Sequence, residues 1–271
     1  INARSLGSTQ NISESVKSRQ NFAEKLFADG TWNVMGDASY VNSQYISNYG
    51  YGVNIFAQTG QVGGFSVGGL LTVMNPFAAN TSYNPGQNNT VQILPVNQQI
   101  TPQELFVEYQ YKNIFQFDVG YIGINNSPWL TYYQNNALNL VTYQGASVNI
   151  HPMHGWLLTA LAFNGSQLVG EDGFSQQTLY NSSFDYGTNT ANIVGDGSNS
   201  TMALGASYAN QANNFGFRLW AYQFNNYANL LYADSNLKLS GGGNLSFTLS
   251  AQAALENGTN ENVFYSTGYG D

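Results

Sequence analysis

The sequence has no cysteine, two histidines and very little charge. Without cysteine there are no disulfides and no thiolate metal ligands. Charged residues make up 8% of the 271 residues, against about 25% in an ordinary soluble domain. The chain has 7 Lys and Arg residues and 15 Asp and Glu residues, which gives a net charge of −8. Because binding phosphates requires a basic stripe, we expect no nucleic-acid partner.

Long hydrophobic runs are also missing, since no window of about 18 consecutive apolar residues occurs to form a transmembrane helix. What the chain has instead is 42% hydrophobic and 14% aromatic residues, with 19 Tyr and 29 Gly. That much apolar material excludes a disordered chain. The sequence therefore specifies a folded protein whose surface is polar without being charged.

The dominant pattern is an alternation of apolar and polar residues over segments of about ten residues, the length of a tilted membrane-spanning strand. From Leu245 to Ala253, for example, every second residue is apolar and those between are Ser, Thr or Gln. The alternation predicts about twelve strands. Eleven cover residues 32–40, 51–57, 65–73, 105–111, 115–121, 146–150, 156–162, 202–208, 215–219, 231–237 and 245–253, and a last one begins near Val263.

The connections between these segments alternate in length. Tight turns are expected at 60–61, 112–113, 151–154, 211–214 and 240–243, and the intervening connections are 42–50, 75–103, 125–139, 164–200, 225–227 and 256–262. Short turns at one end and longer loops at the other are typical of an outer-membrane barrel. The sequence therefore predicts an all-β fold, an antiparallel transmembrane β-barrel with its long loops outside the cell.

The two faces of the predicted strands differ in chemistry. Aromatic residues fall near strand ends, where a membrane interface would place them: Trp32, Tyr40, Tyr51, Tyr109, Tyr111 and Tyr121. Charged residues have the opposite parity, as expected if a charge facing lipid costs a few kcal/mol. The predicted pore-lining residues are Asp37, Glu104, Glu108, Lys112, Asp118, Arg218, Asp234 and Lys238. Asp118 and Arg218 are candidates for opposing walls; the alternative is that some of these charges only pair across strands.

The sequence offers little for catalysis or metal binding. His151 and His154 are the only imidazoles, and Pro152 between them indicates a turn with no carboxylate nearby in sequence. A hydrolase triad would have to place its base in that turn. We therefore expect no enzyme activity, no metal site and no cofactor.

Several segments resemble the OprD-type outer-membrane porins of Gram-negative bacteria. The resemblance is carried by Asn125-Asn126-Ser127-Pro128-Trp129 followed by Thr142-Tyr143-Gln144-Gly145. Residues 23–30, 51–60, 63–70, 108–111, 220–224 and 231–234 also look like family strands or the lead into them, so the resemblance covers most of residues 23–271.

The resemblance implies an eighteen-stranded barrel, monomeric or loosely trimeric, that sits in outer-membrane lipid and takes up small polar solutes. It also implies a constriction loop folded into the lumen, here uncharged and including Asn125, Asn126, Ser127, Pro128, Trp129, Tyr132 and Tyr133. Such a loop would filter by size and hydrogen bonding. The family's anion specificity rests on a ladder of inward Arg and Lys residues. Here only Lys112, Arg218 and Lys238 are available, so neutral solutes or cations are at least as plausible as anions.

Two questions stay open at this level. We expect residues 1–28 to form an N-terminal arm and 29–271 a barrel truncated at its C-terminus, because the chain stops at Gly268-Tyr-Gly-Asp271 instead of on an aromatic strand; a complete twelve-stranded barrel is the alternative. A secreted or surface β-rich binding or adhesive protein is the second functional hypothesis. Such a protein would have to bury its apolar strand faces between two sheets.

Overall fold

Each of the eleven segments with period-two alternation from residue 32 to residue 253 forms a strand, and several strands extend up to six residues beyond the expected bounds. The computed structural model describes residues 27–42, 47–76, 98–130, 141–167, 173–174, 183–185, 190–192, 198–212, 214–240 and 246–258. Eleven strands form one sheet: β1 (Thr31–Asn42), β2 (Ser47–Gln58), β3 (Phe65–Pro76), β4 (Gln99–Tyr111), β5 (Phe115–Ile122), β6 (Thr142–Ile150), β7 (Trp156–Gln167), β10 (Thr201–Ala209), β11 (Phe215–Phe224), β12 (Ala228–Ser240) and β13 (Ser246–Gly258).

The sheet is an antiparallel meander in which each strand pairs with the next one along the chain. The single interruption is a short hairpin of β8 (Ser183–Asp185) and β9 (Thr190–Asn192), which lies between β7 and β10 and forms a separate sheet. The sequence pattern did not predict this hairpin within the long 164–200 connection. The expected strand near Val263 and the expected N-terminal arm up to residue 26 lie outside the described residues.

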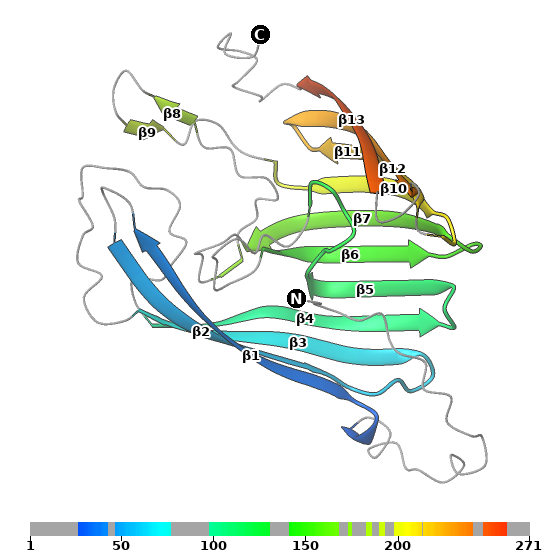
Figure 1. Ribbon diagram of the computed structural model, residues 1–271. Helices are drawn as coiled ribbons and strands as arrows, with labels where there is room; N and C mark the ends of the chain where they lie inside the picture. The colour runs from blue at the N-terminus through cyan, green and yellow to red at the C-terminus, as the bar shows by residue number, and fades with distance from the viewer. Residues whose placement is uncertain are drawn as a thin grey trace, which may run out of the picture.

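The sheet is strongly curved and open. Figure 1 shows β1 to β4 on one side of a trough and β10 to β13 on the other. β1 and β13 are its two ends and, within the described residues, are not paired with each other. Because all neighbours are antiparallel, the first and last of eleven strands run in the same direction. A membrane sheet must pair its edges, and an all-antiparallel closure requires an even strand number. Twelve and eighteen, the two numbers that the sequence left open, both meet this requirement.

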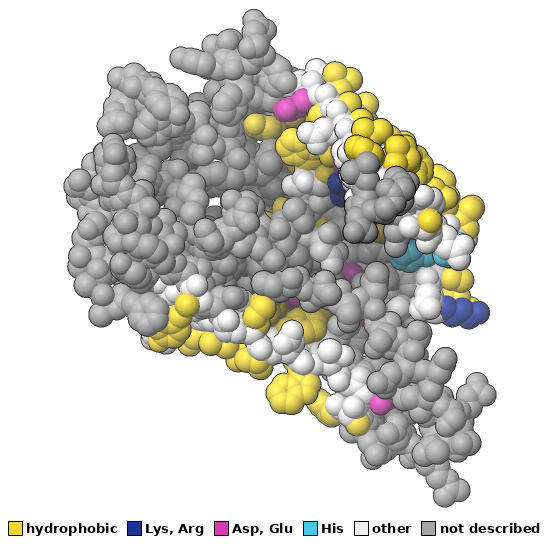
Figure 2. Space-filling model, viewed as in Figure 1, with side chains coloured by type: hydrophobic (Ala, Val, Ile, Leu, Met, Phe, Trp, Pro, Cys, Tyr) yellow, Lys and Arg dark blue, Asp and Glu magenta, His cyan; other side chains and the backbone are white. Residues whose placement is uncertain are grey.

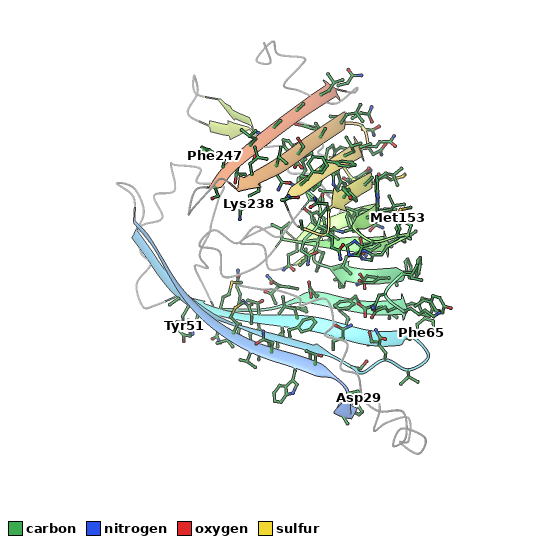
Figure 3. The ribbon with its side chains drawn as sticks, turned by 45° about the vertical axis from the view of Figure 1, so that its right-hand side comes forward. Asp29, Tyr51, Phe65, Met153, Lys238 and Phe247 are labelled. Atoms are coloured by element: carbon green, nitrogen blue, oxygen red, sulfur yellow. The ribbon has the colours of Figure 1, made fainter. Side chains whose placement is uncertain are left out.

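The three long connections, β3–β4, β5–β6 and β7–β10, lie at one end of the sheet, together with the short β1–β2 and β11–β12 connections. The opposite end carries short connections. The β2–β3, β4–β5, β6–β7 and β10–β11 connections are short, with bounds close to those expected from the sequence. In the β6–β7 turn, His151 Nδ1 lies 3.2 Å from the Trp156 carbonyl oxygen and His154 is exposed. Figure 3 shows Phe65 and Met153 at this turn end, with Tyr51 toward the opposite end. We refer to the two ends of the sheet as the turn end and the loop end.

Candidate functional site

The convex surface of the sheet is apolar. A row of directly opposed residues crosses six strands: Val67, Val107, Val119, Ala146, Ala162 and Met202. Many large side chains of this surface are exposed, including Leu204 at 66% and Leu255 at 68%. Figure 2 shows hydrophobic side chains gathered along the outside of the sheet. An exposed apolar surface of this extent, with no charged residue at an outward position of the described barrel strands, fits contact with lipid.

Aromatic rings cluster on this outer surface near the turn end. Trp156 lies 5.2 Å from Tyr208 and 5.7 Å from Phe217 between ring centroids, and Phe65 lies 4.7 Å from Tyr109. The first group lies on the adjacent strands β7, β10 and β11 and the second on β3 and β4, each within a few residues of a turn. Tyr and Trp have an apolar ring and a polar group, and membrane β-barrels carry bands of such residues at the membrane interface. The aromatic residues that the sequence predicted near strand ends include Trp32, which is 78% exposed.

The concave surface is polar on its β2 to β6 side. Gln58 Nε2 donates to Ser66 Oγ and Glu108 Oε1, both at 3.0 Å, and Gln116 Nε2 donates to Glu108 Oε2 and Asp118 Oδ2, both at 2.9 Å. Ser147 Oγ donates to Asp118 Oδ2 at 3.3 Å. Two carboxylates, two amides and two hydroxyls from five strands thus form one network. The predicted pore-lining residues Glu108 and Asp118 both belong to it and both face inward.

Glu104 faces inward at the same parity as Phe106 and Glu108, and a β-bulge adds Gln103 to the same side. The β3–β4 register shifts between Leu70 and Leu71, and both Gln103 and Glu104 are buried on the concave side. A β-bulge of this kind puts two consecutive residues opposite one. Glu104 accepts a hydrogen bond from the backbone N–H of Gly123 at 3.0 Å, just where the chain leaves β5. The carboxylate therefore contacts the start of the following loop.

Arg218 and Asp234 form an ion pair across β11 and β12. They are direct register partners, Arg218 Nη2 lies 2.5 Å from Asp234 Oδ2, and Nε lies 3.0 Å from both carboxylate oxygens. Tyr232 donates its hydroxyl to Asp234 Oδ2 at 2.8 Å. Three strands, β6, β7 and β10, separate β11 from β5, which carries Asp118. The structure therefore brings Arg218 together with Asp234, on a part of the sheet three strands away from β5 and Asp118.

Three predicted pore-lining residues belong neither to the network around Glu108 and Asp118 nor to the Arg218–Asp234 pair. Lys112 is in the β4–β5 turn with a φ of 52°, and its Nζ lies 5.2 Å from the Tyr111 ring centroid. Lys112 thus lies in a turn and not on a strand, so the strand alternation from which its inward position was predicted does not extend to it. Lys238 is exposed on β12 at the inward parity of Asp234. Asp37 is opposite Gly52 in the β1–β2 register, and its side chain is outside what the structure describes.

The loop after β5 folds back over the concave surface, as Figure 1 shows. Ile122 at the end of β5 pairs with Tyr143, whereas Asn126, four residues later, donates to Asn149 Oδ1 at 2.8 Å and Thr159 Oγ1 at 3.0 Å. Asn149 lies six residues beyond Tyr143 along β6, toward the turn end. The chain therefore reverses and runs down the inside of the sheet, where a constriction loop was expected.

A second group of contacts holds this loop against β11. Ser127 Oγ and Tyr222 Oη are 2.8 Å apart, and Ser127 Oγ also accepts the backbone N–H of Leu130 at 3.1 Å. Ile124, Leu130 and Val141 are buried with Tyr143, Phe163, Trp220, Tyr222 and Phe224 from the sheet. Of the remaining predicted loop residues, Asn125 and Trp129 are exposed and Pro128 is half-buried, while Tyr132 and Tyr133 lie outside the described residues.

The concave wall beneath the loop is aromatic, and its rings lie over glycines. Gly68 is opposite Phe106, Gly145 is opposite Phe163, and Gly205 is opposite Trp220 in their registers. A Cβ on Gly205 would meet Trp220 Cε2 at 2.4 Å, and one on Gly68 would meet Phe106 Cζ at 2.4 Å. The absence of a side chain on each glycine lets the ring lie flat against the sheet. The flat rings form an apolar surface on which the loop packs. We call this surface, made of Phe106, Phe163, Trp220, Tyr222 and Phe224, the aromatic seat.

Sequence reasoning missed this aromatic seat. Trp220, Tyr222 and Phe224 face inward, whereas Phe215, Phe217 and Leu219 on the same strand face outward. The available signal was a loss of alternation: from Leu219 onward, both parities of β11 are largely apolar. A strand that is apolar on both faces is expected to be covered on both faces. Here the loop covers the inner face of β11, and the outer face belongs to the exposed apolar convex surface.

Neither a membrane-spanning helix nor a metal centre is found in the described ranges. No helix there is long and apolar enough to cross a membrane. In the same part of the chain, no group of three or more His, Asp or Glu side chains is placed to hold a metal ion.

Comparison with solved structures finds this architecture in bacterial outer membrane proteins. The chain is similar to the outer membrane protein opdK from Pseudomonas aeruginosa, with 14% identity and a TM-score of 0.66 over 86% of this chain and 58% of that chain. It is similar to Acinetobacter baumannii OccAB1, with 13% identity and a TM-score of 0.67 over 86% and 54% of the two chains. It is also similar to P. aeruginosa OccK8 (OprE), with 13% identity and a TM-score of 0.67 over 86% of this chain and 56% of that chain.

The chain thus spans between half and three fifths of the length of these proteins. No protein-family model matches the sequence. No curated protein sequence matches it either. The identities are low, so the likeness establishes the fold: the chain has the all-β, antiparallel fold of the OprD-type outer-membrane porins that its sequence resembles.

Proposed function

We propose that the chain forms the wall and the constriction loop of an outer-membrane porin that passes small polar solutes by diffusion. One observation carries the proposal: the loop from Gly123 to Leu130 lies on the polar concave side of a sheet whose convex side is apolar and exposed. A loop held inside a barrel narrows its lumen, and side chains at the narrowing select solutes by size and hydrogen bonding.

The charges on the concave side favour neutral solutes and cations. Glu104, Glu108 and Asp118 all face inward, whereas the Arg218 guanidinium is engaged by Asp234. Two of the similar structures hold carboxylate ligands: P. aeruginosa OpdK with vanillate and OccK2 (OpdF) with glucuronate. In the described part of this chain, cations at inward strand positions are limited to Arg218 and Lys238. A carboxylate solute would meet net negative potential at the wall.

The binding or adhesive alternative has less support. It requires the apolar strand faces to be buried between two packed sheets, but the structure has a single curved sheet whose apolar face is exposed. The proposal involves passage and no catalytic step.

The experiment that tests the proposal is folding the full-length reading frame into detergent micelles and comparing unheated and boiled samples on a detergent gel, followed by planar-bilayer recording. A heat-dependent mobility shift and stepwise conductance are expected. A chain that is structured and soluble without detergent, shows no shift and inserts no channels would favour the secreted binding protein.

A further inference from the structure

Trp129 is the one large side chain of the described loop that is exposed while its neighbours are anchored. Its exposed fraction is 54%, whereas Ser127 is 3% and Leu130 is 2% exposed. The Ser127–Tyr222 contact and the Leu130 N–H to Ser127 Oγ bond hold the chain on both sides of it. The indole is therefore presented from a fixed turn on the concave side of the sheet.

Trp129 contacts the ring of Tyr232, which is hydrogen-bonded to a charged pair. Its centroid lies 6.2 Å from that of Tyr232, with the planes at 81°. Tyr232 in turn donates to Asp234, which holds Arg218. The Trp129 and Tyr232 rings thus form an aromatic corner, and the Arg218–Asp234 pair lies beside it on the same face of β11 and β12.

We propose that Trp129, Tyr232, Arg218 and Asp234 form a binding subsite for neutral cyclic polyhydroxy solutes, that is, pyranose sugars. This inference rests on the proposed porin function. An exposed indole face packs well against the C–H face of a saturated ring. A guanidinium has five N–H donors. Arg218 directs Nε and Nη2 at Asp234, and its side chain is 43% exposed, so donors such as those of Nη1 remain for hydroxyl oxygens.

The charge balance of the subsite selects neutral rings. The negative charge of Asp234 offsets the positive charge of Arg218, so the subsite is close to neutral. The other polar network of the concave surface, around Glu108 and Asp118, is acidic. A carboxylate ligand would therefore need to displace Asp234 from Arg218. A hydroxyl can instead accept from Arg218 and donate to Asp234 without breaking the pair. Apolar rings together with a few convergent polar groups are the composition typical of small-molecule sites.

The test is sugar block of single-channel current, using the full-length reading frame in planar bilayers with glucose as the probe. Mannitol, an acyclic six-carbon polyol, and gluconate, an acyclic carboxylate, are the comparison solutes. We expect glucose to block at lower concentration than either. Trp129→Ala should raise the half-blocking glucose concentration about tenfold, which corresponds to about 1.4 kcal/mol. Trp129→Phe should restore much of the block.

Trp32→Ala is the matched control, because Trp32 is also exposed but has the outward parity of β1. Its glucose block should equal that of the wild type. Equal block by glucose and mannitol, or a block that Trp129→Ala leaves unchanged in channels of normal conductance, would overturn the subsite and leave the porin function standing. A protein that inserts no channels would overturn both.

Discussion

The hydroxyl oxygens of Ser127 and Tyr222 lie 2.8 Å apart although 95 residues separate them along the chain. Ser127 belongs to the loop after β5, and Tyr222 is on the inner face of β11 beside Trp220, with ring centroids 5.5 Å apart. The Ser127–Tyr222 contact joins the two halves of the sheet through the lumen side and sets how far the loop projects from the wall.

Removal of the Tyr222 hydroxyl should loosen the loop. Tyr222→Phe keeps the ring in its aromatic stack and deletes one buried hydrogen bond, worth about 1 kcal/mol. We expect noisier open-channel current and a wider spread of conductance levels, with the heat-dependent gel shift unchanged. Tyr208→Phe, on the outer surface, is the matched control and should record like the wild type. Identical current noise in both variants would contradict a positioning role for Tyr222.

A charge on the convex surface should destabilise the protein in membranes. Leu204 is 66% exposed on β10 at an outward position. Leu204→Arg should cost about 2–4 kcal/mol if this position lies near the bilayer midplane. Asn236→Arg, at an exposed inward position of β12, should cost much less. The measurement is the free energy of unfolding by urea from lipid vesicles. Equal losses for the two variants would argue against a lipid-facing convex surface.

A methyl group at Gly205 should disturb the aromatic seat. Its Cβ would lie 2.4 Å from Trp220 Cε2, so the indole must move away from the wall. Overpacking of this kind costs about 1–3 kcal/mol, and the shifted ring should also narrow the space for the loop. Gly205→Ala should therefore lower both the urea midpoint and the conductance. At Gly36, where a Cβ has no neighbour within 4 Å, the same substitution should leave both nearly unchanged.

The Arg218–Asp234 pair should set part of the ion selectivity. Asp234→Asn leaves the Arg218 charge without its carboxylate partner, and Arg218→Gln leaves the Asp234 charge. In a salt gradient, the reversal potential of Asp234→Asn should shift toward anion preference and that of Arg218→Gln toward cation preference. Shifts of the same sign in both variants would show that the pair acts only through the structure of the wall.

Most of the sheet was predictable because each strand carries its own signal. In β13 the apolar residues alternate with polar ones from Phe247 to Ala253, and β12 and β13 both formed within a few residues of the expected bounds. The inward positions of Glu108, Asp118, Arg218 and Asp234 followed from the same parity. Alternation failed at the β4 bulge, where Gln103 and Glu104 share one face, and at Lys112, which lies in a turn.

The path of the loop was not predictable from local pattern. Contacts such as Asn126 to Thr159 and Ser127 to Tyr222 depend on the curvature of the whole sheet, which brings distant strands to one surface. The resemblance to a family gave the expectation of a lumen loop, but no residue pattern named its partners. The short β8–β9 hairpin lies in a segment rich in Asn, Ser and Gly, where no period-two signal stands out.

The central claim is that one face of the sheet contacts lipid and the other contacts water. The natural absence of cysteine allows a direct test by single-cysteine scanning along β12, from Leu231 to Leu239. An environment-sensitive fluorophore on outward positions, Leu231, Ala233, Ser235 and Leu237, should be quenched by brominated lipid, and on inward positions, Tyr232, Asn236 and Lys238, by aqueous iodide. A strict alternation between the two quenchers is the predicted result. Iodide quenching at every position, with no effect of brominated lipid, would contradict the account.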